Sequence, residues 1–161
     1  PEIDSIPCMK FMDAKELLMK KYKYQPTDMK DFDPQEEQIL GKYAKKEWDS
    51  DFIFITHYPS KKRPFYTMDD PSDPEYTLSF DLLFRGLEIT SGGQRVHDYN
   101  QQVAKMEKLG MNPEEFATYL MLHKYGAPPH GGDRHHPGYE GSEGRFHNHR
   151  KRQGGPFKND L

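Results

Sequence analysis

The stretch that decides the fold is FRGLEITSGGQRVH, residues 84–97. Its first part continues an apolar strand, and its glycine pair indicates backbone that bends sharply or passes close to a neighbour. Glu88, Ser91 and Arg95 place a carboxylate, a hydroxyl and a guanidinium within eight residues. Carboxylate and hydroxyl oxygens suit Mg²⁺, and arginine can bind a carboxylate through two parallel hydrogen bonds. The stretch therefore suggests a site for a metal ion, a phosphate group and an acidic small molecule.

The same spacing also fits a purely structural interpretation, which is the simpler one from spacing alone. A Glu and an Arg near each other in a hairpin form a solvated ion pair more often than a ligand site. A Gly-Gly pair is usually a turn.

Upstream of this stretch, the pattern predicts a strand, two helices and a second strand. Residues 6–11 favour a short strand, followed by a helix for which Asp13 is the expected cap. A second helix begins after Asp33, where a cap, a Pro and a Glu follow one another as in a capping box, and it ends near Trp48. Residues 52–56 are short, β-branched and aromatic, which predicts a central strand covered on both faces.

The remaining elements complete an α+β fold. Residues 65–68 and 76–87 predict two strands of a wide hairpin, joined by the polar, Pro-rich loop 69–74. Helices are predicted over 98–109 and from a cap at Asn112. The expected architecture is a predominantly antiparallel β-sheet flanked by helices.

Composition limits the class of protein. The 161 residues suit one domain, and the net charge of −3 gives no overall attraction to a polyanion. Cys8 is the only cysteine, which excludes an internal disulfide and fits a reducing compartment. No apolar run approaches the roughly 20 residues of a membrane span, and no secretory signal is visible. We expect a cytoplasmic protein without a membrane segment, and the start at Pro1 predicts a missing N-terminal part.

Composition changes abruptly after Gly132. Residues 133–161 contain no Ile, Val or Met, one Leu, and half of the eight histidines. Such a segment buries too little apolar area to offset the entropy of ordering. We expect residues 133–161 to be disordered.

Three blocks carry a resemblance to a known family. They are THYPSKKRPFY at 56–66, FDLLFRGLEITSGGQRVH at 80–97, and KYGAPPHGG at 124–132. In order and register, the chain resembles class II aminoacyl-tRNA synthetases of the D/K/N subgroup, and in particular aspartyl-tRNA synthetases of the archaeal type. The resemblance runs from about Ile6 to Gly132 and implies the C-terminal part of their catalytic core.

This resemblance implies roles for three residues. Glu88 would bind ATP and Mg²⁺, Ser91 would contribute to the metal and the amino acid, and Arg95 would hold the side-chain carboxylate of aspartate. The implied activity is ATP-dependent activation of aspartate and its transfer to tRNA, by a homodimer in the full-length family. Positioning and charge stabilisation suffice for this reaction, so no catalytic base is assigned.

The resemblance is incomplete at both ends. Residues 1–132 correspond to a partial catalytic domain without the anticodon-binding domain and the first two signature motifs. Residues 133–161 replace the third motif, so Arg134 and Arg145 receive no role. We therefore expect the chain alone to be inactive, and the tail to reflect a frameshift, a mispredicted exon or a gene break. A weak metal-binding tail, built on the four histidines beyond Gly132, is the alternative.

Two other functions stay open. An asparagine-tRNA ligase also places an arginine on the side-chain oxygen, although RPFY at 63–66 favours aspartate. A non-catalytic remnant or paralogue that binds tRNA or a partner protein is the other. His97 is expected to border the amino-acid pocket, and His57 and His130 to be hydrogen-bonded turn residues. The basic run 61–63 is expected to be a solvated loop.

Overall fold

The computed structural model describes residues 5–135. The helices are α1 (Phe11–Lys21), α2 (Pro34–Trp48), α3 (Tyr99–Lys108) and α4 (Ala117–Lys124). The strands are β1 (Cys8–Lys10), β2 (Phe52–Thr56), β3 (Asp69–Asp70), β4 (Asp73–Thr77), β5 (Ser79–Phe84), β6 (Leu87–Gln94) and β7 (Gly131–His135). Short 3-10 turns lie at Ser60–Lys62 and Pro113–Phe116.

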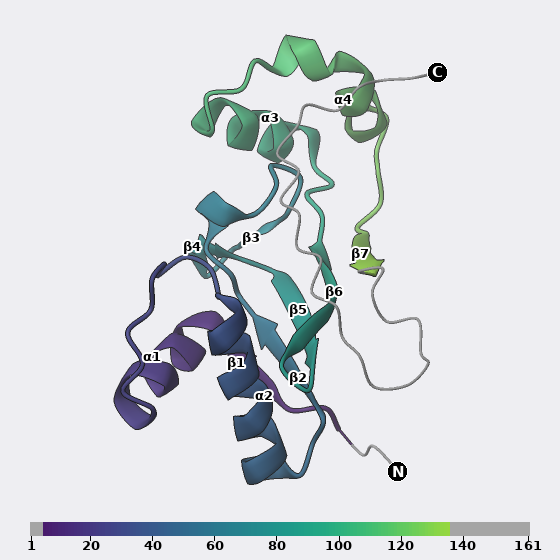
Figure 1. Cartoon of the computed structure of the whole chain (residues 1–161). Coiled ribbons are helices and arrows are strands. Elements are labelled where there is room, and N and C mark those ends of the chain that lie inside the picture. The colour runs from purple at the N-terminus through teal and green to yellow at the C-terminus, as the bar shows by residue number, and fades with distance from the viewer. Residues whose placement is uncertain (1–4, 136–161) are drawn as a thin grey trace, which may run out of the picture.

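A five-stranded sheet forms the centre of the molecule, in the order β1-β2-β5-β6-β7 (Figure 1). β1 and β2 are parallel, and the other neighbouring strands are antiparallel. β2 is an interior strand with a partner on each edge, as its apolar sequence predicts. The expected α+β architecture, a largely antiparallel sheet flanked by helices, is confirmed.

The hydrophobic core lies between one face of the sheet and the helices α1 and α2. Ile53, Ile55 and Leu83 point into it from β2 and β5 and are at most 1% exposed. The helices and the segment between them contribute Phe11, Ala14, Leu18, Phe32, Leu40 and Ala44. On the opposite face of β2, Phe52 and Phe54 are only half-buried. Among the described residues, the predicted cover of both faces of β2 is therefore complete on the core face and only partial on the other.

Two glycines fix α2 against the turn between β5 and β6. A Cβ on Gly41 would lie 2.3 Å from the backbone nitrogen of Gly86, so only a glycine permits this approach. Gly86 itself has φ +80°, a left-handed conformation that glycine adopts without strain. This contact holds the helix against the hairpin from which Glu88 projects.

The two ends of the hairpin region differ from the predicted strands. Residues 65–68 form a turn, because the Thr67 N–H donates to the Pro64 carbonyl at 3.0 Å instead of joining a ladder. Only Thr67 makes a bridge, to Arg95. The predicted strand 76–87 is divided among β4, β5 and the start of β6, and the polar loop 69–74 instead forms the two-stranded sheet β3-β4.

Side-chain caps start α2 and α3, whereas α1 and α4 begin without one. The helix predicted over residues 98–109 is α3, and Asp98 caps it by accepting from the Gln101 N–H at 2.8 Å. Asn112 opens a 3-10 turn before α4 begins, so the fourth helix starts later than expected. Asp13 is not a cap, because β1 runs directly into α1 and the capping position is Lys10. Asp13 lies in the first turn, where a negative charge favours the helix dipole.

The predicted start of the disordered segment, at residue 133, is too early. Residues 133–135 belong to β7 and pair with β6, with Arg134 opposite Ser91 and His135 opposite Thr90. Strand pairing uses backbone hydrogen bonds, so an edge strand can form without apolar side chains. The rest of the predicted tail, from His136, lies outside the described residues.

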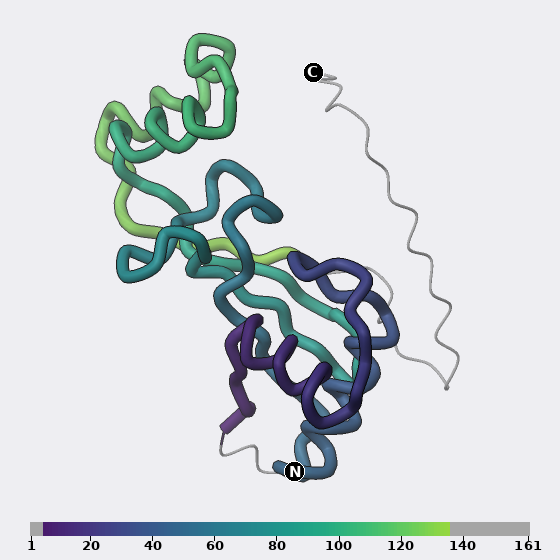
Figure 2. The backbone as a smooth tube through the Cα atoms, turned by 90° about the vertical axis from the view of Figure 1, so that its left-hand side faces the viewer, coloured from purple at the N-terminus to yellow at the C-terminus, as the bar shows by residue number. Residues whose placement is uncertain are grey.

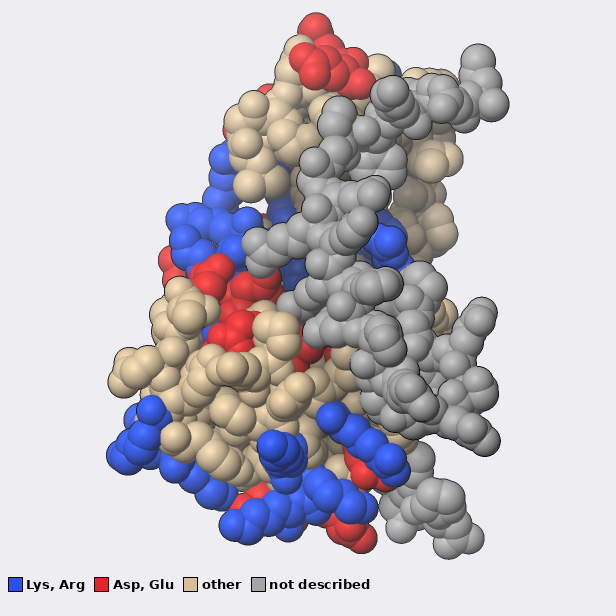
Figure 3. All heavy atoms as spheres, viewed as in Figure 1, with Lys and Arg blue, Asp and Glu red and all other residues tan. Residues whose placement is uncertain are grey.

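The helices α3 and α4 lie beyond one end of the sheet, away from α1 and α2 (Figure 2). Lys and Arg gather over the α1 and α2 end of the face in Figure 3, whereas acidic and basic side chains adjoin each other at mid-height. None of the helices within residues 5–135 has the length and apolarity needed to cross a membrane.

Replacing Asp33 with Ala is expected to lower the free energy of unfolding by about 1 kcal/mol. Asp33 Oδ1 accepts from the N–H groups of Gln35 and Glu36 at 2.8 and 2.9 Å, and Tyr24 donates to Oδ2 at 2.8 Å. Urea unfolding measures the change, with Asp13→Ala as the control that removes a first-turn acid without a capping bond. Equal effects of the two substitutions would show that the cap contributes nothing specific.

Candidate active site

Strands β5 and β6 place two carboxylates and a hydroxyl on one face of the sheet. Asp81 is paired with Ser91, and Leu83 is paired with Glu88. A bulge adds one β6 residue between these two pairs, which returns Glu88 and Ser91 to the same face although they are three positions apart. Because directly opposed residues share a face, Asp81, Glu88 and Ser91 project from the same side.

Asp81 is a buried carboxyl group with a raised pKa. Burial raises this pKa to about 6; the positive charge of Arg63 opposes the shift and the negative charge of Glu88 adds to it. Burial also raises the pKa of the neighbouring Tyr58 hydroxyl well above its ordinary value. Two carboxylates therefore repel each other at this corner of the sheet, and a cation placed between them would relieve that repulsion.

Arg63 contradicts the expectation that the run 61–63 is a solvated loop. Lys61 and Lys62 of this run are exposed, but the Arg63 guanidinium is mostly buried. Arg63 Nη2 donates to Asp81 Oδ1 at 2.8 Å, and its guanidinium carbon lies 3.9 Å from the centroid of the Tyr58 ring. Arg63 Nε is buried and has no hydrogen-bond partner among the described residues. Arg63 thus belongs to the Asp81 cluster and retains a donor that a ligand can use.

Arg95 lies just beyond β6 and is half-buried. Its guanidinium carbon is 4.2 Å from the centroid of the Tyr66 ring, a cation–π contact. A Cβ on Gly132 would lie 3.0 Å from Arg95 Nε, so the side chain crosses the backbone of β7. Within residues 5–135, no Asp or Glu lies within 4.0 Å of this guanidinium. Arg95 is therefore a cation in place without an acidic partner in the described part of the chain.

A strip of bare backbone separates Ser91 from Arg95. Gly93 and Gly132 are cross-strand partners between them, and neither has a side chain on the site face. Alternation along the strand puts Ser91, Gly93 and Arg95 on one face, and the Arg95 guanidinium folds back over Gly132. The predicted residues Glu88, Ser91 and Arg95 thus share one face, with the two oxygen ligands at one end and the cation at the other.

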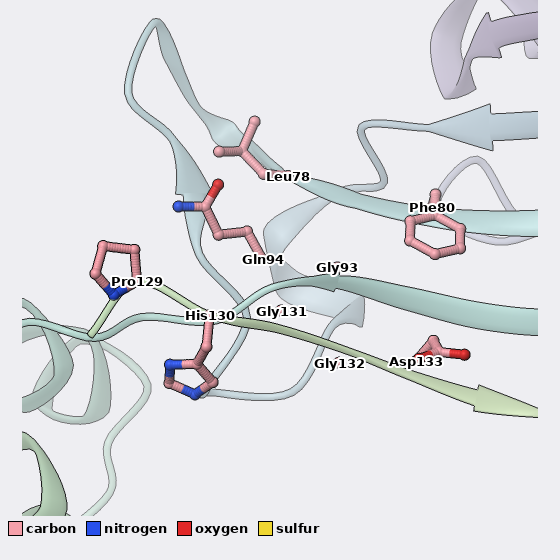
Figure 4. A pocket seen from close by; sticks show the side chains of 9 residues that line it. All are labelled: Leu78, Phe80, Gly93, Gln94, Pro129, His130, Gly131, Gly132 and Asp133. Carbon is pink, nitrogen blue, oxygen red and sulfur yellow. The ribbon is translucent and has the colours of Figure 1, made fainter. Parts of the chain in front are cut away.

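The cavity found beside this strip opens on the opposite face of the sheet. It measures about 610 Å³, and Gly93 of β6 and Gly131 and Gly132 of β7 form part of its lining (Figure 4). Phe80 and Asp133, two of its lining residues, both oppose Gly92 and therefore face away from Asp81 and Ser91. The cavity lies behind the candidate site and does not join its residues.

The three histidines for which the sequence predicts an environment differ in their surroundings. His57 Nδ1 is 2.8 Å from Thr56 Oγ1, and His130 Nδ1 is 2.9 Å from the Pro128 carbonyl oxygen, so both are hydrogen-bonded as expected. Both lie in irregular segments and not in turns. His97 Nδ1 is buried without a hydrogen-bond partner among the described residues. Its role at the border of an amino-acid pocket stays a prediction.

The donors around Asp81 fit a hard divalent cation. Mg²⁺ prefers oxygen ligands, binds one or two carboxylates, and keeps waters and substrate phosphates as its other ligands. Asp81, Glu88 and Ser91 supply two carboxylates and a hydroxyl from one face. No group of three or more His, Cys, Asp and Glu within residues 5–135 forms a metal site by itself. Two carboxylates and a hydroxyl fit Mg²⁺ that takes its remaining ligands from water or phosphate.

Comparison with known proteins gives a consistent family. Residues 3–135 match the sequence model of the class II tRNA synthetases (D, K and N). An aspartate–tRNA(Asp/Asn) ligase from Thermus thermophilus is 49% identical over 127 residues, which cover 79% of this chain and 29% of that protein. The corresponding ligase from Aeropyrum pernix is 47% identical with the same coverage. The chain thus spans less than a third of the length of these relatives.

Solved structures agree with the sequence relatives. An aspartyl-tRNA synthetase from Entamoeba histolytica has a TM-score of 0.75 and 33% identity, covering 81% of this chain and 27% of that chain. An asparaginyl-tRNA synthetase from Pyrococcus horikoshii has a TM-score of 0.68 and 31% identity, covering 81% of this chain and 30% of that chain. This chain belongs to the class II tRNA synthetases of the D, K and N group.

Proposed function

We propose that this chain is part of the catalytic domain of an enzyme that activates aspartate with ATP and transfers it to tRNA. The observation that carries the proposal is Arg95, a half-buried cation without an acidic partner among residues 5–135. A guanidinium in this position matches the side-chain acid group of aspartate through two parallel hydrogen bonds. Eight curated relatives at 44–49% identity carry the name aspartate–tRNA ligase, which supports the same substrate.

The reaction has two steps, and the described residues act in it by positioning. The aspartate α-carboxylate attacks the α-phosphorus of ATP and releases pyrophosphate, giving aspartyl-adenylate. A terminal hydroxyl of tRNA then attacks the activated carbonyl and releases AMP. Arg95 orients aspartate by its side chain, and this orientation presents the α-carboxylate to the nucleotide.

Asp81, Glu88 and Ser91 are the residues that would hold Mg²⁺ together with ATP. When bound there, Mg²⁺ would neutralise phosphate charge and so lower the barrier to attack by a carboxylate. In the absence of a nucleotide, Arg63 partly neutralises Asp81. We propose no protein nucleophile and no general base.

Asparagine is the alternative substrate. Asparaginyl-tRNA synthetases from Pyrococcus horikoshii and Entamoeba histolytica are among the similar structures, at 27–32% identity. An arginine serves both substrates, so the sequence RPFY at 63–66 and the names of the curated relatives favour aspartate over asparagine. Competition between the two amino acids for activation by one enzyme separates the alternatives.

The domain boundary of this chain, and the oligomeric state and compartment of the full-length protein, are further proposals. We propose that the family portion is a partial catalytic domain that ends near His135, where the family match ends, and that the remaining residues are foreign to the family. Sequencing the transcript across codons 132–137 tests the proposed gene break, which a clean in-frame message would contradict. We further propose that the full-length protein is a homodimer and is cytoplasmic. The single cysteine is in line with the cytoplasmic location.

The isolated 161-residue chain is expected to show no aspartate-dependent exchange of pyrophosphate into ATP, because it spans 29% of its relatives and supplies part of a site. The decisive experiment is a chimaera of the Thermus relative in which residues 6–132 of this chain replace the matching segment. We expect the chimaera to catalyse the exchange. A folded chimaera that binds tRNA but does not exchange pyrophosphate would instead favour the non-catalytic remnant.

A further inference from the structure

The position of the Arg95 guanidinium is set by two neighbours that touch it directly. The Tyr66 ring lies 4.2 Å from the guanidinium carbon, measured to the ring centroid. The Gly132 backbone passes so close that a Cβ there would lie 3.0 Å from Nε and 3.1 Å from Nη2. The Arg95 guanidinium is in none of the ion pairs found among residues 5–135. The ring and the bare backbone are therefore its main restraints in the described chain.

Tyr66 is held through its own backbone and through its neighbour Phe65, whose ring centroid lies 5.4 Å from that of Tyr66. The Val96 N–H donates to the Tyr66 carbonyl at 2.9 Å, which connects the backbone of Tyr66 to the residue that follows Arg95. The preceding residue, Phe65, accepts from Gln102 Nε2 at 3.0 Å through its carbonyl and packs on Tyr119 at 5.5 Å between ring centroids. A platform anchored to α3 and α4 thus supports the guanidinium.

Gly132 is distinguished from its neighbour Gly131 by what a side chain would meet. A Cβ on Gly132 meets three atoms of Arg95 within 3.4 Å, whereas a Cβ on Gly131 meets only the Gly93 backbone, at 3.3 Å or more. The two residues also face opposite sides of the sheet, because they are adjacent in a strand. A methyl group at 132 therefore presses on the guanidinium, and one at 131 does not.

We infer that Tyr66 and Gly132 are positioning residues, which hold the Arg95 guanidinium over the glycine strip and direct it back toward Ser91. The role of this geometry rests on the proposed function. In that function, the plane of the guanidinium faces the acid group of the amino-acid substrate. A side chain at 132 lifts the guanidinium off the strip and reduces selectivity for an acidic substrate. Loss of the Tyr66 ring leaves it without a stacking partner and with more freedom.

The test is the Nε–Hε signal of Arg95 in NMR spectra of the 161-residue chain. Protons above an aromatic ring face are shielded, so stacking on Tyr66 shifts this signal upfield of an unstructured arginine. The variants are Gly132→Ala and Tyr66→Leu, with Gly131→Ala and Tyr66→Phe as matched controls. The first control adds the same methyl group one residue away, and the second keeps the ring but removes the hydroxyl.

We expect Gly132→Ala and Tyr66→Leu to lose most of the upfield shift, and Gly131→Ala and Tyr66→Phe to retain it. A signal that stays in place in Gly132→Ala, or that moves as far in Tyr66→Phe as in Tyr66→Leu, would overturn the inference. If a variant loses amide dispersion and is unfolded, the other residue's pair still decides. Failure of the chimaera to exchange pyrophosphate, with these shifts as expected, would remove the proposed function but leave the positioning intact.

Discussion

Replacing Lys15 with Met is expected to lower the free energy of unfolding by about 3–5 kcal/mol, because it leaves a buried carboxylate without its partner. Lys15 and Glu36 side chains are both 0% exposed, and Lys15 Nζ lies 2.7 and 2.9 Å from the two Glu36 oxygens. The same ammonium donates to the carbonyls of Asp28 and Asp31 at 2.8 and 2.6 Å. One cation therefore joins α1, the following loop and the start of α2.

The matched control lies on the same helix. Lys20 pairs with Glu16 at 2.6 Å, but their side chains are 76% and 55% exposed, and water screens the pair. Lys20→Met should change stability by less than about 1 kcal/mol. Urea unfolding of both variants gives the comparison. The double variant Lys15→Met with Glu36→Gln should lose less free energy of unfolding than the two single variants lose together, since no charge is left buried. Equal losses for Lys15→Met and Lys20→Met would contradict this account of the core.

Replacing Arg95 with Ala in the Thermus chimaera is expected to reduce kcat/KM for aspartate roughly 30- to 5,000-fold, the equivalent of about 2–5 kcal/mol for truncating one member of a buried charge pair. Arg95→Lys should retain part of the binding, because an ammonium keeps the charge but cannot make two parallel bonds. The KM for ATP should change little, since Glu88 and Ser91 lie at the other end of the strip. Aspartate-dependent pyrophosphate exchange, measured at varied aspartate and at varied ATP, checks both expectations.

Arg85→Ala is the control for this prediction. Arg85 is in the turn just before β6, its side chain is 64% exposed, and it pairs with Asp51 at 3.3 Å. Removing it takes away one arginine near the hairpin without touching the candidate site, so exchange should be nearly unchanged. A loss for Arg85→Ala as large as for Arg95→Ala would mean that the effect is one of general charge or folding.

The elements that could be predicted are those whose signals are local. The capping box at Asp33 and the following Pro fix the start of α2 within one residue, because the side chain and backbone groups involved are neighbours in sequence. The run Phe52–Thr56 coincides with β2 for the same reason: its residue types favour a strand and are too few for a helix. Local chemistry decides these boundaries, and tertiary contacts only reinforce them.

The errors occur where distant contacts decide. Residues 65–68 have strand-like side chains, but the Thr67 N–H closes a turn onto the Pro64 carbonyl, and pairing with the end of β6 is limited to the single bridge of Thr67 with Arg95. Asp13 looks like a cap, but β1 is drawn against β2 and leads directly into α1, which starts at Phe11. The edge strand β7 was missed because β6 supplies its hydrogen bonds, and its own sequence offers few apolar residues.

The candidate site was partly visible in the sequence. Glu88, Ser91 and Arg95 were named from residue type and resemblance, but simple alternation would put Glu88 and Ser91 on opposite faces. The bulge in the β5-β6 ladder reverses this, and a bulge depends on pairing that sequence alone does not reveal. Asp81 and Arg63 were not nominated. Their signal was an acid at an inward position of an otherwise apolar strand, which must find a cation when buried.

The most direct test is a crystal structure of the chimaera with Mg²⁺, a non-hydrolysable ATP analogue and aspartate. The account predicts the metal beside oxygens of Asp81, Glu88 or Ser91, and the aspartate side-chain carboxylate on the Arg95 guanidinium, all on one face of β6. Binding of the nucleotide or aspartate in the cavity beside Phe80 and Gln94, on the other face of the sheet, would contradict it.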